Sequence, residues 1–268
     1  MIDLGKGPPI VLIPGIQGRW EWLAPTVEAL SKRCRVLTVS LPGDVGSFHP
    51  IKPLRGFDNY VDYIDELLDR ASLKHAALCG VSYGGWIALR YAARRPNRAS
   101  SLTLVSPPSP DGIQGRRVKW YLRAPRLLSP LFALSSPFRL YPEIAAAIPE
   151  LSARATFIWQ HLRRVSRHPF VPLRMAERIR MANQIDFRQE CAIVEAPTLV
   201  VTGEQRFDRV VPLSSSLQYV DSITDAHHVE IPGTGHIGLV TKPKLFAKLT
   251  SDFVKIHSPM NTSVKISV

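Results

Sequence analysis

The 268-residue sequence has few cysteines and no long apolar run. Its three cysteines, Cys34, Cys79 and Cys191, are too few and too scattered for a disulfide framework or a zinc site. Cys34 and Cys79 lie within apolar runs, which predicts small core residues. No window approaches the ~18 uninterrupted apolar residues that a membrane-spanning helix needs. The first residues also lack a basic segment followed by an apolar one. These absences predict a cytoplasmic protein without stable membrane insertion.

Acidic residues are also scarce, with 22 Asp and Glu against 34 Lys and Arg, a formal net charge of +12. The excess is concentrated in residues 107–190, which hold 14 basic and 6 acidic residues. Such a field would attract an anionic substrate or membrane surface. It is equally explained as solvated helix faces. Zinc-finger spacing, an RNA-binding aromatic signature and a heptad-backed basic helix are all missing, so no nucleic-acid partner is expected.

Short apolar runs alternate with amphipathic segments along most of the chain. Helical spacing of apolar residues predicts helices near 23–31, 61–71, 86–93 and 242–255, with Asp58 capping the second. Between them lie apolar runs of strand length: 10–13, 35–39, 76–79, 102–105, 197–201 and 228–231. This alternation predicts an α/β fold, a mostly parallel sheet covered by helices on both faces.

The alternation is interrupted between residues 107 and 191. This segment contains no clear strand, and its leucines, arginines, aromatic residues and prolines predict a cap or lid of short helices. The prolines at 125, 130 and 137 are expected to break up any long helix. The predicted organisation is therefore a core of residues 1–106 and 192–257, a helical cap at 107–191 and a tail at 258–268.

The strongest local motif is Gly80-Val81-Ser82-Tyr83-Gly84, a G-x-S-x-G between a predicted strand and a predicted helix. A serine on such a sharp turn projects its hydroxyl above the edge of the sheet. The flanking glycines are needed because side chains there would collide with the strand and helix. The following helix N-terminus favours developing negative charge. Ser82 is the candidate nucleophile.

A serine nucleophile requires a base, and His236 is the best placed of the eight histidines. It lies in the glycine-rich turn Pro232–Gly238, between the last predicted strand and the last predicted helix. Such a turn can place an imidazole over the carboxyl edge of the sheet. The other histidines lie in strands, in the basic segment or in places without a supporting motif.

The base in turn needs a carboxylate, and the segment Thr202–Pro212 offers Glu204 and Asp208. An acid after the penultimate strand and before the histidine completes the order Ser, Asp/Glu, His. Asp208 is favoured because the sequence Asp-x-Val-Val-Pro leads from it into the next helix. Glu204 remains the alternative, although it directly follows Gly203 at the strand end.

A loop near the N-terminus could bind the oxyanion of a reaction intermediate. The sequence Pro14-Gly15-Ile16-Gln17-Gly18 follows the first clear strand, and its glycines would let a backbone amide point at a developing charge. The expected donors are the amides of Ile16 and of Tyr83, the residue after the candidate nucleophile. Gln17 is the rival donor.

Together these motifs resemble the α/β-hydrolase superfamily, in its compact form with a helical cap inserted after the sixth strand. The resemblance covers nearly all of residues 8–257 and implies a nucleophile–base–acid triad of Ser82, His236 and Asp208. Two features depart from the family. The oxyanion loop begins Pro-Gly rather than His-Gly, and four residues rather than two separate Gly203 from Asp208.

The leading functional hypothesis is a hydrolase of carboxylic esters or thioesters that uses neither metal nor organic cofactor. Trp120 and Phe132 in the cap, with Gln17, are the candidate substrate-binding residues for an apolar or anionic acyl compound. Two alternatives remain. The same residues could cleave a carbon–carbon or amide bond, or the fold could serve a ligand- or partner-binding protein without catalysis.

Overall fold

The computed structural model describes residues 1–112 and 116–258 of the chain. Its centre is a seven-stranded sheet of order β1-β3-β2-β4-β5-β6-β7, parallel except for β1 (Ile2–Leu4). The other strands are β2 (Pro9–Ile13), β3 (Arg35–Thr38), β4 (Ala76–Val81), β5 (Ala99–Val105), β6 (Thr198–Gly203) and β7 (Ala226–Ile231). The predicted fold class and all six predicted strands are confirmed. The short edge strand β1 was not predicted.

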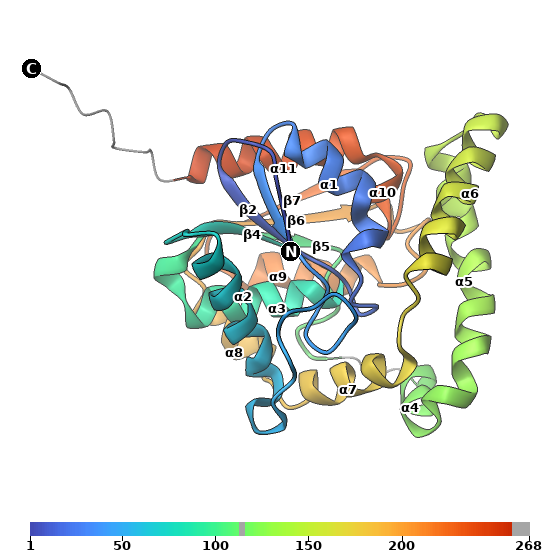
Figure 1. The fold of residues 1–268 in the computed structure, drawn as a ribbon. Helices are drawn as coiled ribbons and strands as arrows, with labels where there is room; N and C mark the ends of the chain where they lie inside the picture. The colour runs from blue at the N-terminus through green and yellow to red at the C-terminus, as the bar shows by residue number, and fades with distance from the viewer. Residues whose placement is uncertain (113–115, 259–268) are drawn as a thin grey trace, which may run out of the picture.

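Alternate residues of each strand face opposite layers of helices. In β2, Val11 and Ile13 face a core shared with α2 (Asn59–Arg70), α3 (Tyr83–Arg94), α8 (Phe187–Ala192) and α9 (Leu213–Ser222). Ile10 and Leu12 face a second core with α1 (Ala24–Ser31), which a 3-10 turn at Trp20–Leu23 precedes, and α11 (Pro243–His257). Figure 1 shows these two layers on either side of the sheet. Cys34 and Cys79 are buried in the second core, as predicted.

The segment between β5 and β6 is helical where the structure describes it. It comprises α4 (Arg116–Arg123), α5 (Pro125–Ala147), α6 (Leu151–Arg167), α7 (Pro172–Ala182) and α8. Helices α4 to α7, called here the helical insertion, lie outside the two layers (Figure 1). Helix α8 packs on α3 instead, and its Phe187 ring stacks on Trp86 at 4.7 Å between centroids. The last helix of the predicted cap range thus contributes to the core.

Helix α5 corrects the expectation of short helices broken at prolines. It runs for 23 residues, with Pro125 in its first turn and Pro130, Pro137 and Pro142 inside it. Proline in the first turn suits a helix because the amide it lacks has no partner there anyway. Inside a helix each proline removes one backbone hydrogen bond and favours a kink, without necessarily ending the helix.

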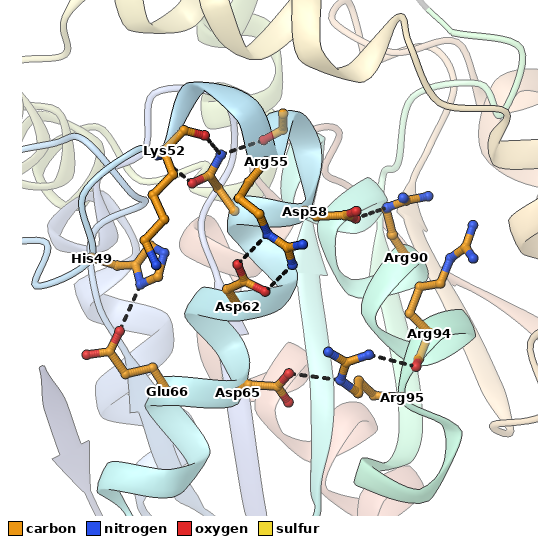
Figure 2. Close-up of polar contacts among 12 residues, drawn as sticks. His49, Lys52, Arg55, Asp58, Asp62, Asp65, Glu66, Arg90, Arg94 and Arg95 are labelled. Atoms are coloured by element: carbon orange, nitrogen blue, oxygen red, sulfur yellow. Dashed lines mark hydrogen bonds and ion pairs between the residues drawn. The ribbon is translucent and has the colours of Figure 1, made fainter.

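Helices α2 and α3 are joined by ion pairs (Figure 2). Asp58 was expected to cap α2, but its side chain does not do so. Its carboxylate accepts a 2.7 Å hydrogen bond from Arg90, and it makes no side-chain bond to the helix amides. The Asn59 side chain holds the preceding turn instead, through Lys52 and the Gly56 carbonyl. Tertiary pairing with α3 therefore prevailed over local capping.

Asp65 should be an important stabilising residue of this interface. Its carboxylate accepts hydrogen bonds of 2.8 Å from Tyr91, Arg95 and Arg98. Asp65→Asn removes the charge and part of this acceptor capacity, so we expect a loss of about 1–3 kcal/mol in the free energy of unfolding. Urea denaturation measures it.

Asp69→Asn is the matched control on the same helix. Its side chain is 68 % exposed and, within the part of the chain that the structure describes, forms an ion pair with Arg98 alone. The loss in free energy of unfolding should therefore stay within about 1 kcal/mol. Equal losses for the two variants would contradict the role given to Asp65.

Candidate active site

Ser82 stands on a strained turn between β4 and α3. Its backbone has φ 52° and ψ −119°, a conformation that residues other than glycine rarely adopt. The turn is held by the Ser82 amide, which donates to the Val105 carbonyl at 2.8 Å, and by the Gly85 amide, which donates to the Ser82 carbonyl. Ser82 is half-buried. Among the described residues its hydroxyl has no hydrogen-bond partner.

The two motif glycines are required by close backbone contacts. A Cβ on Gly80 would lie 2.2 Å from the Gly84 carbonyl oxygen. A Cβ on Gly84 would lie 2.5 Å from the Ile13 carbonyl oxygen. Neither distance is tolerable, and backbone cannot swing aside as a flexible side chain could. The spacing in G-x-S-x-G therefore has the steric cause inferred from the sequence.

His236 and Asp208 are brought together from two neighbouring loops. His236 Nδ1 lies 3.2 Å from Asp208 Oδ2, and the two side chains are 11 % and 6 % exposed. The other Asp208 oxygen accepts from the amides of Val210 and Val211, both at 2.9 Å. This arrangement holds the carboxylate and leaves one oxygen for the imidazole.

The electrostatics of the pair favour the charged forms. Burial raises the pKa of Asp208, but the neighbouring imidazole and the two amides outweigh it and hold the pKa below its usual range. Burial lowers the pKa of His236, but the Asp208 carboxylate outweighs it, so the pKa is raised. Glu143 also raises this pKa, whereas Arg139 lowers it. The imidazole can therefore accept a proton more readily than an ordinary histidine.

Glu204 contacts a different part of the histidine loop. One oxygen of its carboxylate accepts from the Gly233 amide, the other from Arg206. The chain then turns at Glu204, whose carbonyl accepts from the amides of Phe207 and Asp208 at 3.0 and 3.1 Å. This turn accommodates the two additional residues noted in the sequence. Of the two candidate acids, Asp208 is the one hydrogen-bonded to His236.

Glycine also permits these loops to approach each other. A Cβ on Gly235 would lie 2.6 Å from the Phe207 carbonyl carbon, and one on Gly203 would lie 2.5 Å from Gly235 Cα.

Ser82, Asp208 and His236 follow β4, β6 and β7, so all three lie at the carboxyl edge of the parallel sheet. Among the described residues no hydrogen bond joins Ser82 to His236. Such bonds often tighten only when substrate is bound.

The loop after β2 lies beside Ser82. A Cβ on Gly15 would be 3.7 Å from Ser82 Cβ and 3.4 Å from Gln17 Oε1, and the Gly18 amide closes the turn on the Gly15 carbonyl at 2.8 Å. In the described structure the Ile16 amide has no hydrogen-bond acceptor. The Tyr83 amide, at the first position of α3, has none within its helix. Both expected oxyanion donors are thus available.

Comparison with known proteins gives the family. Residues 10–249 match the alpha/beta hydrolase family. The chain belongs to this family. It is 29 % identical to 2-hydroxymuconate semialdehyde hydrolase of Pseudomonas sp. strain CF600, covering 94 % of this chain and 88 % of that one. Monoacylglycerol lipase ABHD6 of Bos taurus is 24 % identical, with 96 % and 79 % covered.

Solved structures of similar proteins have the same fold as this chain. The enol-lactonase from Burkholderia xenovorans LB400 superposes with a TM-score of 0.76 at 22 % identity, covering 95 % of each chain. The curated relatives are named hydrolases, which supports the prediction that this alpha/beta hydrolase family member is one too. The relatives differ in the substrates they are named for.

Arg178 holds the loop after β2, and the sequence did not reveal this contact. The side chain comes from α7 and is 1 % exposed. It donates to the Ile16 carbonyl at 2.8 Å and pairs with Asp44, which is also buried. In the sequence Arg178 is one of many arginines, so only tertiary contacts distinguish it.

The structure constrains the candidate substrate-binding residues of the helical insertion less than it constrains Ser82, Asp208 and His236. Trp120 on α4 is 62 % exposed, with the Arg123 guanidinium 5.7 Å from its ring centroid. Phe132 falls on α5, but its side chain lies outside the described residues. Tyr121 is buried against Met175 and Ala176 of α7. The assignments of Trp120 and Phe132 to substrate stay predictions.

Residues 1–112 and 116–258 contain neither a membrane-spanning helix nor a cluster of metal-ligating side chains. No helix there is long and apolar enough to cross a membrane. No group of three or more His, Cys, Asp or Glu side chains in the same residues is arranged to hold a metal ion.

Proposed function

We propose that the protein is a serine hydrolase of carboxylic esters or thioesters, with Ser82 as nucleophile, His236 as base and Asp208 as the orienting acid. The observation that carries the proposal is the buried His236–Asp208 hydrogen bond of 3.2 Å, at the same sheet edge as the strained Ser82 turn. A serine on such a turn and a histidine oriented by a buried carboxylate are the two parts that acyl transfer needs.

The proposed reaction proceeds in two halves through an acyl-enzyme. Ser82 Oγ attacks the substrate carbonyl carbon while His236 takes the hydroxyl proton. The amides of Ile16 and Tyr83 stabilise the oxyanion, each such donor being worth roughly 3 kcal/mol in the transition state. His236 then gives the proton to the leaving alcohol or thiol. Water, deprotonated by the same imidazole, releases the acid.

The proposed substrate is a small acyl compound that is apolar or anionic. The helical insertion supports this class, because the basic excess of residues 107–190 would attract an anion to the sheet edge. Its leucines and aromatic side chains suit an apolar acyl chain. The relatives named for a semialdehyde and for a monoacylglycerol justify testing both polar and lipid-like compounds.

Labelling of Ser82 tests the proposal most directly. A fluorophosphonate probe should modify the wild-type protein at Ser82, identified by peptide mass spectrometry. Labelling should slow as pH falls through the His236 pKa, because the protonated imidazole cannot act as a base. A protein that stays unlabelled at every pH would favour the non-catalytic binding role.

A substrate panel then separates the bond types. We expect p-nitrophenyl esters and acyl thioesters to be hydrolysed faster than matched anilides and 1,3-diketones. A preference for the diketones would replace ester hydrolysis by carbon–carbon cleavage with the same residues.

A further inference from the structure

Glu143 is a buried acid in the helical insertion that the proposed reaction does not use. It lies on α5 and is 0 % exposed. Burying a carboxylate is costly unless it is paired or hydrogen-bonded. Its position next to the histidine loop therefore calls for a functional explanation.

One carboxylate oxygen of Glu143 is hydrogen-bonded to the residues around His236. Oε1 accepts from the Thr234 hydroxyl at 2.9 Å and from the Ile237 amide at 2.7 Å. Burial raises the pKa of Glu143 above its usual range, while the Gly235 amide, the Thr234 hydroxyl and the positive charge of a protonated His236 oppose this and favour the ionised carboxylate. Glu143 therefore contacts the chain immediately before and immediately after His236.

The other oxygen, Oε2, is buried and has no hydrogen-bond partner among the described residues. Every polar contact described for Glu143 comes from a donor, as a carboxylate requires. A buried carboxylate with one oxygen left without a hydrogen bond lowers the stability of the fold. A hydrophobic side chain would serve packing alone at lower cost.

We infer that Glu143 is a positioning residue for His236, through which the helical insertion holds the histidine loop and stabilises the imidazolium. This inference rests on the proposed function of His236 as a base. Glu204 holds the start of the same loop, because its amide donates to the Thr234 carbonyl at 2.8 Å and its side chain binds the Gly233 amide. The loop is thus fixed from β6 on one side and from α5 on the other.

The charges that face His236 come from two elements. Asp208 lies in the loop after β6, while Glu143 and Arg139 lie on α5. Asp208 makes the direct hydrogen bond and Arg139 opposes protonation. Removing the negative charge of Glu143 while leaving Arg139 in place must destabilise the imidazolium, so the His236 pKa must fall.

Glu143→Gln is the informative variant because its amide oxygen can still accept from Thr234 and Ile237. We expect the His236 pKa, measured by NMR titration of its ring proton, to move to lower pH. The acidic limb of kcat/KM on a p-nitrophenyl ester should move with it. A His236→Ala variant assigns the resonance. Glu150→Gln is the matched control, since Glu150 is an exposed acid of the same segment and should leave the titration unchanged.

Glu143→Ala tests positioning separately from charge. It leaves the Thr234 hydroxyl and the Ile237 amide without their acceptor, so kcat should fall about tenfold or more while KM stays within about threefold. Circular dichroism and thermal unfolding would show whether both variants are folded at the assay temperature.

An unchanged His236 titration in Glu143→Gln, with kcat of folded Glu143→Ala within twofold of wild type, would overturn the inference and leave Glu143 a packing residue. If Glu143→Ala does not fold, the titration of Glu143→Gln decides alone. Failure of the proposed function is distinguishable, because the wild type would then resist the fluorophosphonate whatever the Glu143 variants do.

Discussion

Ser82→Ala should abolish both fluorophosphonate labelling and ester hydrolysis. Loss of the nucleophile in serine hydrolases lowers kcat on the order of 10⁶-fold, so only the small residual rate supplied by substrate binding and the oxyanion donors should remain. Alanine has no hydroxyl to attack the carbonyl, so His236 has no serine proton to take and the acyl-enzyme cannot form. The measurement is single-turnover and steady-state hydrolysis of p-nitrophenyl acetate and butyrate.

Correct folding must be shown for this variant, because Ser82 has φ 52°. Alanine in this conformation is strained too, but it replaces serine with a side chain of similar size, so the thermal unfolding midpoint should change little. Ser106→Ala is a useful control, since Ser106 has a positive φ of 40° at the end of the neighbouring strand. Undiminished activity in Ser82→Ala would refute the nucleophile assignment.

Asp208→Asn should lower kcat by about 10⁴-fold, while KM changes much less. The amide removes the negative charge beside Nδ1 and can stabilise the wrong imidazole tautomer. Loss of the charge also destabilises the imidazolium, so the pKa of His236, raised in the native protein, must fall. The acidic limb of the pH profile should therefore move to lower pH, which distinguishes this defect from simple unfolding.

Glu204→Gln is the matched control on the same loop. Its amide oxygen can still accept from the Gly233 amide, and the contact that it loses is with an exposed arginine, Arg206. We expect kcat within about threefold of wild type, since exposed ion pairs contribute little. If Glu204→Gln caused the larger loss, Glu204 would replace Asp208 as the acid.

The sheet and the serine turn were predictable because their causes are local. Apolar runs such as Ile10–Ile13 indicate strands that are buried on both faces of the sheet. The glycines at 80 and 84 indicate backbone contacts only a few ångströms away. Strand β1, Ile2–Leu4, was missed because three residues at an edge carry too little pattern. Helix α5 was missed as a single helix because its prolines obscure its length.

The sequence by itself determined the family, the serine on its turn, the histidine loop and the short segment that had to hold an acid. The tertiary structure alone decided which acid contacts His236, because the turn at Glu204 directs one carboxylate to the imidazole and the other to the Gly233 amide. It alone revealed Arg178 and Glu143. Arg178 contacts Ile16, which lies 162 residues earlier in the chain, and Glu143 contacts Ile237, which lies 94 residues later. Such contacts depend on how distant segments pack, and residue type and local spacing do not encode that.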